Sequence, residues 1–229
     1  MRRFTLSVAA VAAVSMLAAC GGGSNLKADL DASKQKKAKI ALVSLSVSDF
    51  GRSLQFGNAS GVGDLITKKM DEMAVLTEAS LGTAWTVVPA ASIVANDGYL
   101  KLAKAEAKDN LYTATHMKLF SADRSDQVKT RLDPQMAKDL CAALGVDLVA
   151  VVYSEWTTVT GGFVPTTKAY AKTVFSIWDN QGRQLYKDRK DVEGAKTLGA
   201  FGRAQVDENS LDVWVGAYKT GLDKMMSSM

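Results

Sequence analysis

The hydrophobic and polar positions follow two periodicities along the chain, one typical of strands and one of helices. Residues 40–47 form an uncharged run rich in β-branched side chains, which is typical of a strand buried on both faces. Between residues 64 and 79 the apolar positions recur at near-helical spacing, and this predicts a helix. A short strand over 85–88 and a second helix over 99–107 are predicted next, whereas 108–133 has no clear period.

The clearest folding signal lies between Asp133 and residue 159. Asp133 is a typical N-cap, Pro134 suits the first helical position, and Gly145 is a typical helix stop. A buried strand that begins at residue 148 and continues to residue 159 follows almost at once. This pattern predicts a helix joined by a tight turn to a central strand.

The C-terminal third is predicted to complete the sheet. Residues 169–178 have strand character, and residues 179–182 form a reverse-turn signal. A polar strand over 183–190 carries the charges expected of an exposed sheet edge. After a flexible stretch over 194–209, apolar positions from residue 211 to 225 predict a closing helix that packs on the sheet.

This order of elements, β-α-β-α-α-β-β-β-α, predicts an α/β (α+β) fold. We expect a single domain of two or three layers, with a mixed sheet of about five strands and a closing C-terminal helix. The number of residues is sufficient for one domain with a proper core.

The first twenty residues have a different character. Arg2 and Arg3 precede an apolar run over residues 4–17, and small residues lead to Cys20, which is the layout of an export signal. The uncharged run is shorter than the roughly 20 residues that a permanent membrane-spanning helix needs. We therefore expect this leader to be removed.

The sequence Leu17-Ala18-Ala19-Cys20 resembles the lipobox of bacterial lipoproteins. The resemblance implies that residues 1–19 form a signal peptide and that Cys20 is lipidated and becomes the first residue of the mature protein. The partner it implies is a membrane, reached through the acyl chains on Cys20. In that family an Asp after the cysteine often retains the protein in the inner membrane, and Gly21 at this position favours lipid anchoring at the periplasmic side of the outer membrane. Residues 20–38, which are mostly small or polar, are predicted to be a flexible tether, and residues 39–229 a single periplasmic domain.

Charge and cysteine content narrow the possible functions. The formal net charge is +4, and removal of two leader arginines lowers it to +2, which argues against nucleic acid as a partner. Cys141 is left without a second cysteine if Cys20 carries lipid, and its place in an amphipathic helix favours a buried, unreactive thiol.

Candidate chemistry is sparse. The run Gly57–Gly63 matches neither common phosphate-binding glycine pattern, and His116, the sole histidine, does not combine with the scattered acids into a metal set. We therefore expect no cofactor and no metal. Pairs of acids are the remaining catalytic candidates, either Asp147 with Glu155 or Asp123 with Asp126.

Residues 134–190, together with the first strand, resemble the small α/β domain of several bacterial envelope proteins. These are the curli-secretion lipoproteins, the N-terminal domain of the Tol-system β-propeller protein and the lipoprotein activators of penicillin-binding proteins. The resemblance implies a non-enzymatic protein of the cell envelope that binds or assembles with another envelope protein.

Two hypotheses about function follow. The first is a lipid-anchored binding or assembly module that docks an envelope protein through the 183–190 edge or the 155–170 hairpin. The alternative is an envelope hydrolase that uses one of the two acid pairs. The sequence does not decide whether Trp156 and Trp178 belong to the core or to a contact surface.

Overall fold

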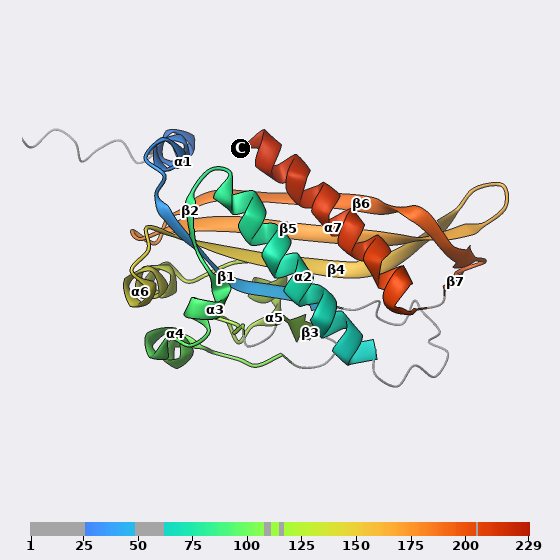
Figure 1. The fold of residues 1–229 in the computed structure, drawn as a ribbon, viewed down its shortest axis with the longest axis horizontal. Coiled ribbons are helices and arrows are strands. Elements are labelled where there is room, and N and C mark those ends of the chain that lie inside the picture. Colours follow the sequence, from blue (N-terminus) through green and yellow to red (C-terminus); the bar gives the residue numbers. More distant parts are fainter. Residues whose placement is uncertain (1–25, 49–61, 108–110, 115–116, 205) are drawn as a thin grey trace, which may run out of the picture.

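The computed structural model describes residues 26–48, 62–107, 111–114, 117–204 and 206–229. Within these residues the chain forms one mixed sheet of seven strands in the order β2-β1-β4-β5-β6-β7, with β3 paired to the far end of β1 (Figure 1). The strands are β1 (Lys39–Ser48), β2 (Thr86–Val88), β3 (Leu111–Thr113), β4 (Leu148–Gly161), β5 (Thr166–Asp179), β6 (Gln184–Ala200) and β7 (Arg203–Ala204). The α/β class is confirmed, with more strands than predicted.

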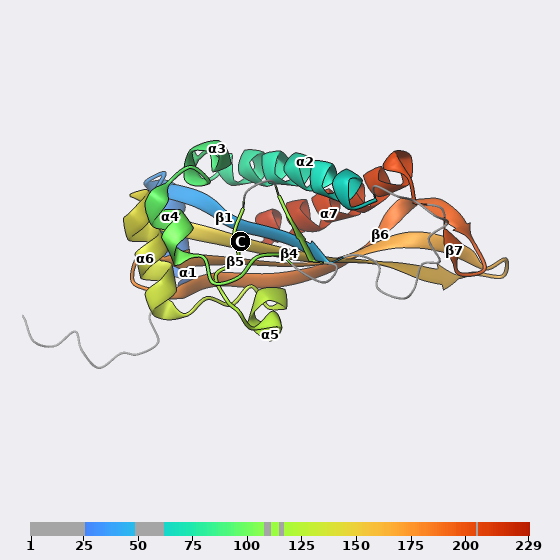
Figure 2. The same cartoon turned by 90° about the horizontal axis from the view of Figure 1, so that it is seen from below.

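Helices cover both faces of the sheet, so the body has three layers. In Figure 2, α2 and α7 lie above the sheet, and α5 and α6 lie below it. The helices are α1 (Leu26–Gln35), α2 (Val62–Gly82), α3 (Ala90–Ile93), α4 (Asp97–Leu102), α5 (Arg124–Val128), α6 (Pro134–Leu144) and α7 (Glu208–Ser228). Each face has its own apolar core, since alternate residues of β1 and β4 point to opposite sides.

Strand β1 lies between parallel neighbours β2 and β4. Residues 40–48 are buried without exception, which confirms the predicted strand with two covered faces. The three serines in this strand occur where the apolar run is interrupted, and Ser48 shares a hydrogen bond of 2.7 Å with the Tyr153 hydroxyl. This hydrogen bond compensates for the burial of the Ser48 hydroxyl at that end of the strand.

The predicted cap, helix and stop of α6 are confirmed. The Asp133 carboxylate accepts the Gln135 N–H at 2.8 Å, Pro134 is the first helical residue, and Gly145 adopts a left-handed φ of 62°. This unit was predictable because its signals are local and each satisfies an end of the same helix.

The predicted tether is partly wrong, because residues 26–35 form α1 and pack on the body. Leu30 is 2% exposed, and Ser33 Oγ accepts a hydrogen bond from Trp85 Nε1 at 2.9 Å. The Arg183 guanidinium also bonds the Asp29 carboxylate at 2.8 Å. A polar helix of ten residues is marginal alone, so α1 owes its stability to these distant partners.

Other predicted boundaries differ from the structure. The polar strand continues as β6 to Ala200, well into the stretch predicted to be flexible, and α4 ends at Leu102. Residues 108–133, predicted without regular structure, contain β3 and α5. The closing helix is confirmed, and it begins earlier than predicted because Asp207 and Ser210 form a capping box.

Candidate docking surface

The hairpin of β4 and β5 extends beyond the covered part of the sheet. Residues 148–154 of β4 are all buried, whereas residues 159–161 are all exposed. The N-terminal half of α7 supports the transition, because the Trp156 and Trp214 rings stack with centroids 6.2 Å apart. Trp214 Nε1 also donates to the Thr157 carbonyl oxygen at 2.8 Å. We call the part of this hairpin beyond Trp156 the arm. It is fixed at its base and projects at its tip (Figure 1).

Two turns meet at the tip and carry large apolar side chains. Phe163 is fully exposed and Val164 is 62% exposed in the β4–β5 turn, and Phe201 is 74% exposed in the β6–β7 turn. The turns are joined by the Phe201 N–H, which donates to the Pro165 carbonyl at 2.9 Å, and by the Gly202 N–H, which donates to Thr167 Oγ1 at 3.0 Å. We call Phe163, Val164 and Phe201 the tip surface.

The backbone at Phe201 is strained. Its φ is 54°, in the left-handed region that an aromatic residue rarely occupies. Such strain costs of order 1 kcal/mol or more and is concentrated at functional sites. Glycine would adopt this φ without strain, so the presence of an aromatic side chain here favours a role in contact with a partner.

The strands that lead to the tip surface carry basic side chains. Lys168 forms an ion pair with Glu193 at 3.3 Å, and both side chains remain substantially exposed. Arg203 is exposed in β7, and Lys196 lines a groove of about 480 Å³ between β6 and α7. Exposed apolar side chains at the end of strands with polar and charged residues are typical of a surface where a protein docks.

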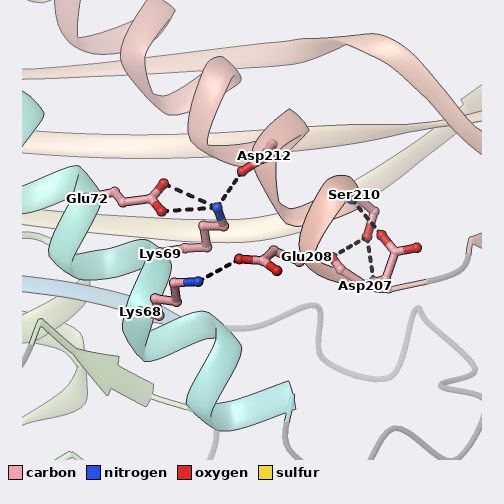
Figure 3. A network of polar contacts seen from close by, with 7 residues as sticks. All are labelled: Lys68, Lys69, Glu72, Asp207, Glu208, Ser210 and Asp212. Atoms are coloured by element: carbon pink, nitrogen blue, oxygen red, sulfur yellow. Dashed lines mark hydrogen bonds and ion pairs between the residues drawn. The ribbon is translucent and has the colours of Figure 1, made fainter.

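A cluster of ion pairs fixes α7 to α2 behind this arm (Figure 3). The Lys69 side chain is only 7% exposed, and its Nζ contacts Asp212 at 2.6 Å and Glu72 at 3.0 Å. Lys68 bonds Glu208 at 2.7 Å. The hydrogen bond to Asp212, helped by Glu72, raises the pKa of Lys69 despite the opposing effect of burial. The cluster is structural, since its charges are directed at one another.

The structure separates the acids of the first candidate catalytic pair. Asp147 directly precedes β4 and Glu155 lies within it, eight positions further on, which corresponds to roughly 27 Å of extended chain. Asp147 accepts the Lys39 N–H at 2.9 Å, and Glu155 contacts Lys172 at 3.0 Å. These two carboxylates do not converge on a common site.

The second pair occupies local structural roles. Asp123 caps α5 by accepting the Ser125 N–H at 2.7 Å, and Asp126 contacts Arg131 at 3.3 Å. Their hydrogen bonds explain why two acids lie close in this short segment.

Other residues singled out from the sequence have these positions. Cys141 is buried, and burial raises its pKa to about 12, which confirms the expected inert thiol. Trp156 and Trp178 both belong to the core. Cys20, His116 and residues 57–61 of the glycine-rich run lie outside the described residues, and Val62 and Gly63 begin α2.

Sequence reasoning found one half of the tip surface and missed the other. The 155–170 hairpin was a predicted docking element, whereas Phe201 fell in the stretch predicted to be flexible. An available signal was the Phe201-Gly202 pair, which marks a turn between two polar strands.

Among the described residues no group of three or more His, Cys, Asp or Glu side chains could hold a metal ion. No helix in that part of the chain has both the length and the apolar character needed to span a bilayer.

Comparison with known proteins gives no family assignment. No family model and no curated protein matches the sequence. Lipoprotein GNA1162 from Neisseria meningitidis is similar in structure, with 16% identity, coverage of 84% of this chain and 99% of that one, and a TM-score of 0.34. The hypothetical protein CT253 from Chlamydia trachomatis has 12% identity, coverage of 84% and 92%, and a TM-score of 0.33. The LpoB C-terminal domain from Salmonella enterica has 9% identity, coverage of 74% and 98%, and a TM-score of 0.33.

Proposed function

We propose that this chain is a non-enzymatic envelope protein, lipid-anchored through Cys20 at the periplasmic side of the outer membrane, that docks another envelope protein through its tip surface. The observation that carries the proposal is the gathering of Phe163, Val164 and Phe201, all exposed, at one end of the molecule. An exposed apolar patch ringed by polar groups is typical of a protein interaction site.

The arrangement of the two ends supports this division of roles. Helix α1 contacts Arg183, which follows the body end of β5, whereas the tip lies at the other end of that fourteen-residue strand. At about 3.4 Å per residue the strand separates the two ends by roughly 48 Å. Residues 20–25 can span at most roughly 20 Å. An anchor at Cys20 would therefore hold the α1 end near the membrane and direct the tip outward.

The chemistry of the tip defines the kind of partner. Lys168, Lys196 and Arg203 lie on the strands that lead to the apolar side chains, and Glu193 pairs with Lys168. The complementary surface is an apolar pocket with an acidic rim on a protein. The hydrolase alternative loses its support because Asp147 and Glu155 lie far apart and Asp123 and Asp126 are engaged locally.

A photo-crosslinking experiment in intact cells tests the docking proposal. A photoreactive phenylalanine analogue at position 163 should give a discrete crosslinked species with one protein. The matched control is the same analogue at Val75, which is 66% exposed on α2 in the body. Crosslinking at both positions alike, or at neither, would contradict docking through the tip.

A second substitution tests whether the crosslink depends on the tip surface, and lipid labelling tests the anchor separately. Replacing Phe201 with Ser should remove the crosslink from position 163, because both side chains belong to one surface. Palmitate labelling should be lost in Cys20→Ser and kept in Cys141→Ser. Equal labelling of the Cys20 variant would remove the anchoring part of the proposal and leave the docking part standing.

A further inference from the structure

We infer that the free edge of β6 pairs with β6 of a second copy of this chain, antiparallel, about a two-fold axis through Lys190. This inference concerns a different surface from the tip and does not depend on lipid anchoring. It rests on the open backbone edge of β6 and on the order of charges along it.

The outer edge of β6 is open over its central part. On one side β6 pairs with β5, and on the other, among the residues that the structure describes, only β7 pairs with it, at Gly199 and Ala200. The Arg189 N–H donates to the Asp188 carboxylate at 2.7 Å, so it faces away from β5. By the alternation of an antiparallel ladder, the backbone groups of residues 187, 191 and 193 face the same edge.

The charges on this edge are self-complementary. Lys187, Arg189, Asp191 and Glu193 follow one another at every second position and so lie on one face of the strand. Pairing about an axis through Lys190 places Arg189 opposite Asp191 of the second copy, and Lys187 opposite Glu193. Each contact occurs twice, and all four join opposite charges, which favours the pairing.

The neighbouring registers are excluded by the same charges. An axis through Arg189 would place that residue opposite its own copy, and an axis through Asp191 would do the same for two carboxylates. Like charges directly opposite are destabilising. An axis between two residues would join an outward-facing backbone group to an inward-facing one, and the hydrogen bonds would not form.

The surroundings of β6 set the length of the pairing. Helix α1 contacts the beginning of β6 through Asp29 and Arg183, and the register with β5 is irregular beyond Glu193. About seven residues, 187–193, are therefore available, which is an ordinary strand length. The groove of about 480 Å³ between β6 and α7 begins at Glu193, at one end of this segment.

Within one copy the same charges are already paired along the strand. The Arg189 guanidinium contacts Asp191 at 2.7 Å, and Lys190 contacts Asp188 at 2.7 Å. Pairing of two copies exchanges two Arg189–Asp191 contacts, one within each strand, for two such contacts between strands. Charges on an edge can alternatively serve only to prevent pairing. The experiments below separate the two roles, because a preventive role predicts a monomer in every case.

Cysteine crosslinking tests the register. In the purified full-length chain, Lys190→Cys should form an intermolecular disulfide on oxidation with copper phenanthroline, since residues on the axis face each other at a separation that a disulfide can bridge. Lys187→Cys is the matched control, because the two copies of position 187 would be roughly 20 Å apart. Most of the Lys190→Cys chain should migrate as a dimer without reductant. No dimer, or equal dimer from both variants, would overturn the inference.

A mixing experiment tests the charge pattern independently. Arg189→Asp and Asp191→Arg should each be monomeric in analytical ultracentrifugation, because each places like charges opposite one another. An equimolar mixture should form a heterodimer, since every Asp then faces an Arg of the other variant. The mixture does not restore the contact within one strand, so dimer formation would report pairing alone. A monomeric mixture, or unchanged dimers in either single variant, would contradict the inference.

Discussion

The two ends of the sheet use apolar side chains in opposite ways. At the body end, helices cover both faces, and residues 148–154 of β4 are all buried. At the tip, Phe163 and Phe201 are exposed, although the same strands continue into it. Apolar side chains stabilise a fold only where another element removes them from water. The body therefore carries the stability of this protein, and the tip surface is available for contact.

The largest expected effect is at the junction of the two ends. Replacing Trp214 with Ala removes a fully buried ring that stacks on Trp156 and bonds the Thr157 carbonyl. We expect the free energy of unfolding in urea to fall by about 3–5 kcal/mol. Phe163→Ala is the matched control and should leave it almost unchanged. A loss below about 1 kcal/mol for Trp214→Ala would mean that α7 does not hold the arm.

Two glycines with similar φ angles compare the ends directly. Gly182 has a φ of 75° in the body, and an added Cβ would press on the Pro134 carbonyl group. Gly202 has a φ of 77° at the tip, and its Cβ would meet open space. We expect Gly182→Ala to cost about 3 kcal/mol and Gly202→Ala about 1 kcal/mol, because only the first adds a clash to the backbone strain. Chemical denaturation measures both, and equal losses would contradict close packing at the β5–β6 turn.

The Lys69 cluster predicts a pH dependence confined to the body. The pKa of Lys69 is raised in the folded state. The contribution of its ion pairs to stability is therefore fully present below the ordinary value of 10.5 and is lost as the pH rises through the raised value. Lys69→Met should cost about 1 kcal/mol at pH 8, after allowance for the half-exposed carboxylates, and less at pH 11. Lys219→Met, which disrupts an exposed pair with Asp223, is the control and should change stability less. A cost that does not decrease between pH 8 and pH 11 would count against the ion pairs.

The smallest expected effect on stability is at the tip. Phe201→Gly should leave the free energy of unfolding unchanged or raise it by up to about 1 kcal/mol, because glycine tolerates the left-handed φ without strain. The same variant should lose the crosslink from position 163. Unfolding measurements and crosslinking in the same variant check the two parts together. A marked loss of stability would show that the tip supports the fold.

The sequence was sufficient where the determining signals are local. The Asp133 cap, Pro134 and Gly145 each act on one helix, and that helix was predicted to the residue. The uncharged run of β1 identified a covered strand for the same reason. The α1 helix was missed because its partners, Trp85 and Arg183, are far away in sequence. Its own composition is that of a solvated segment.

The site was predictable in part. A hairpin around residues 155–170 follows from two strand patterns and a glycine turn, but its projection beyond the helices depends on where α7 begins. Phe201 joins the tip surface only because its N–H bonds the Pro165 carbonyl, a pairing that no periodicity indicates. The charges of β6 were read as an exposed edge, and β5 and β7 leave that edge open over its centre.

The parallel pairing of β1 has a consequence for how the chain reaches its native state. Its neighbours are residues 86–88 and 148–155, so both are synthesised well after it, and the second is more than a hundred positions downstream. During synthesis β1 therefore emerges before either of its parallel partner strands, whereas β4, β5 and β6 can form successive hairpins with short-range contacts. Closure of the sheet around β1 is thus a late step. A nascent chain interrupted before β4 would expose an apolar strand with an unpaired edge, which chaperones bind.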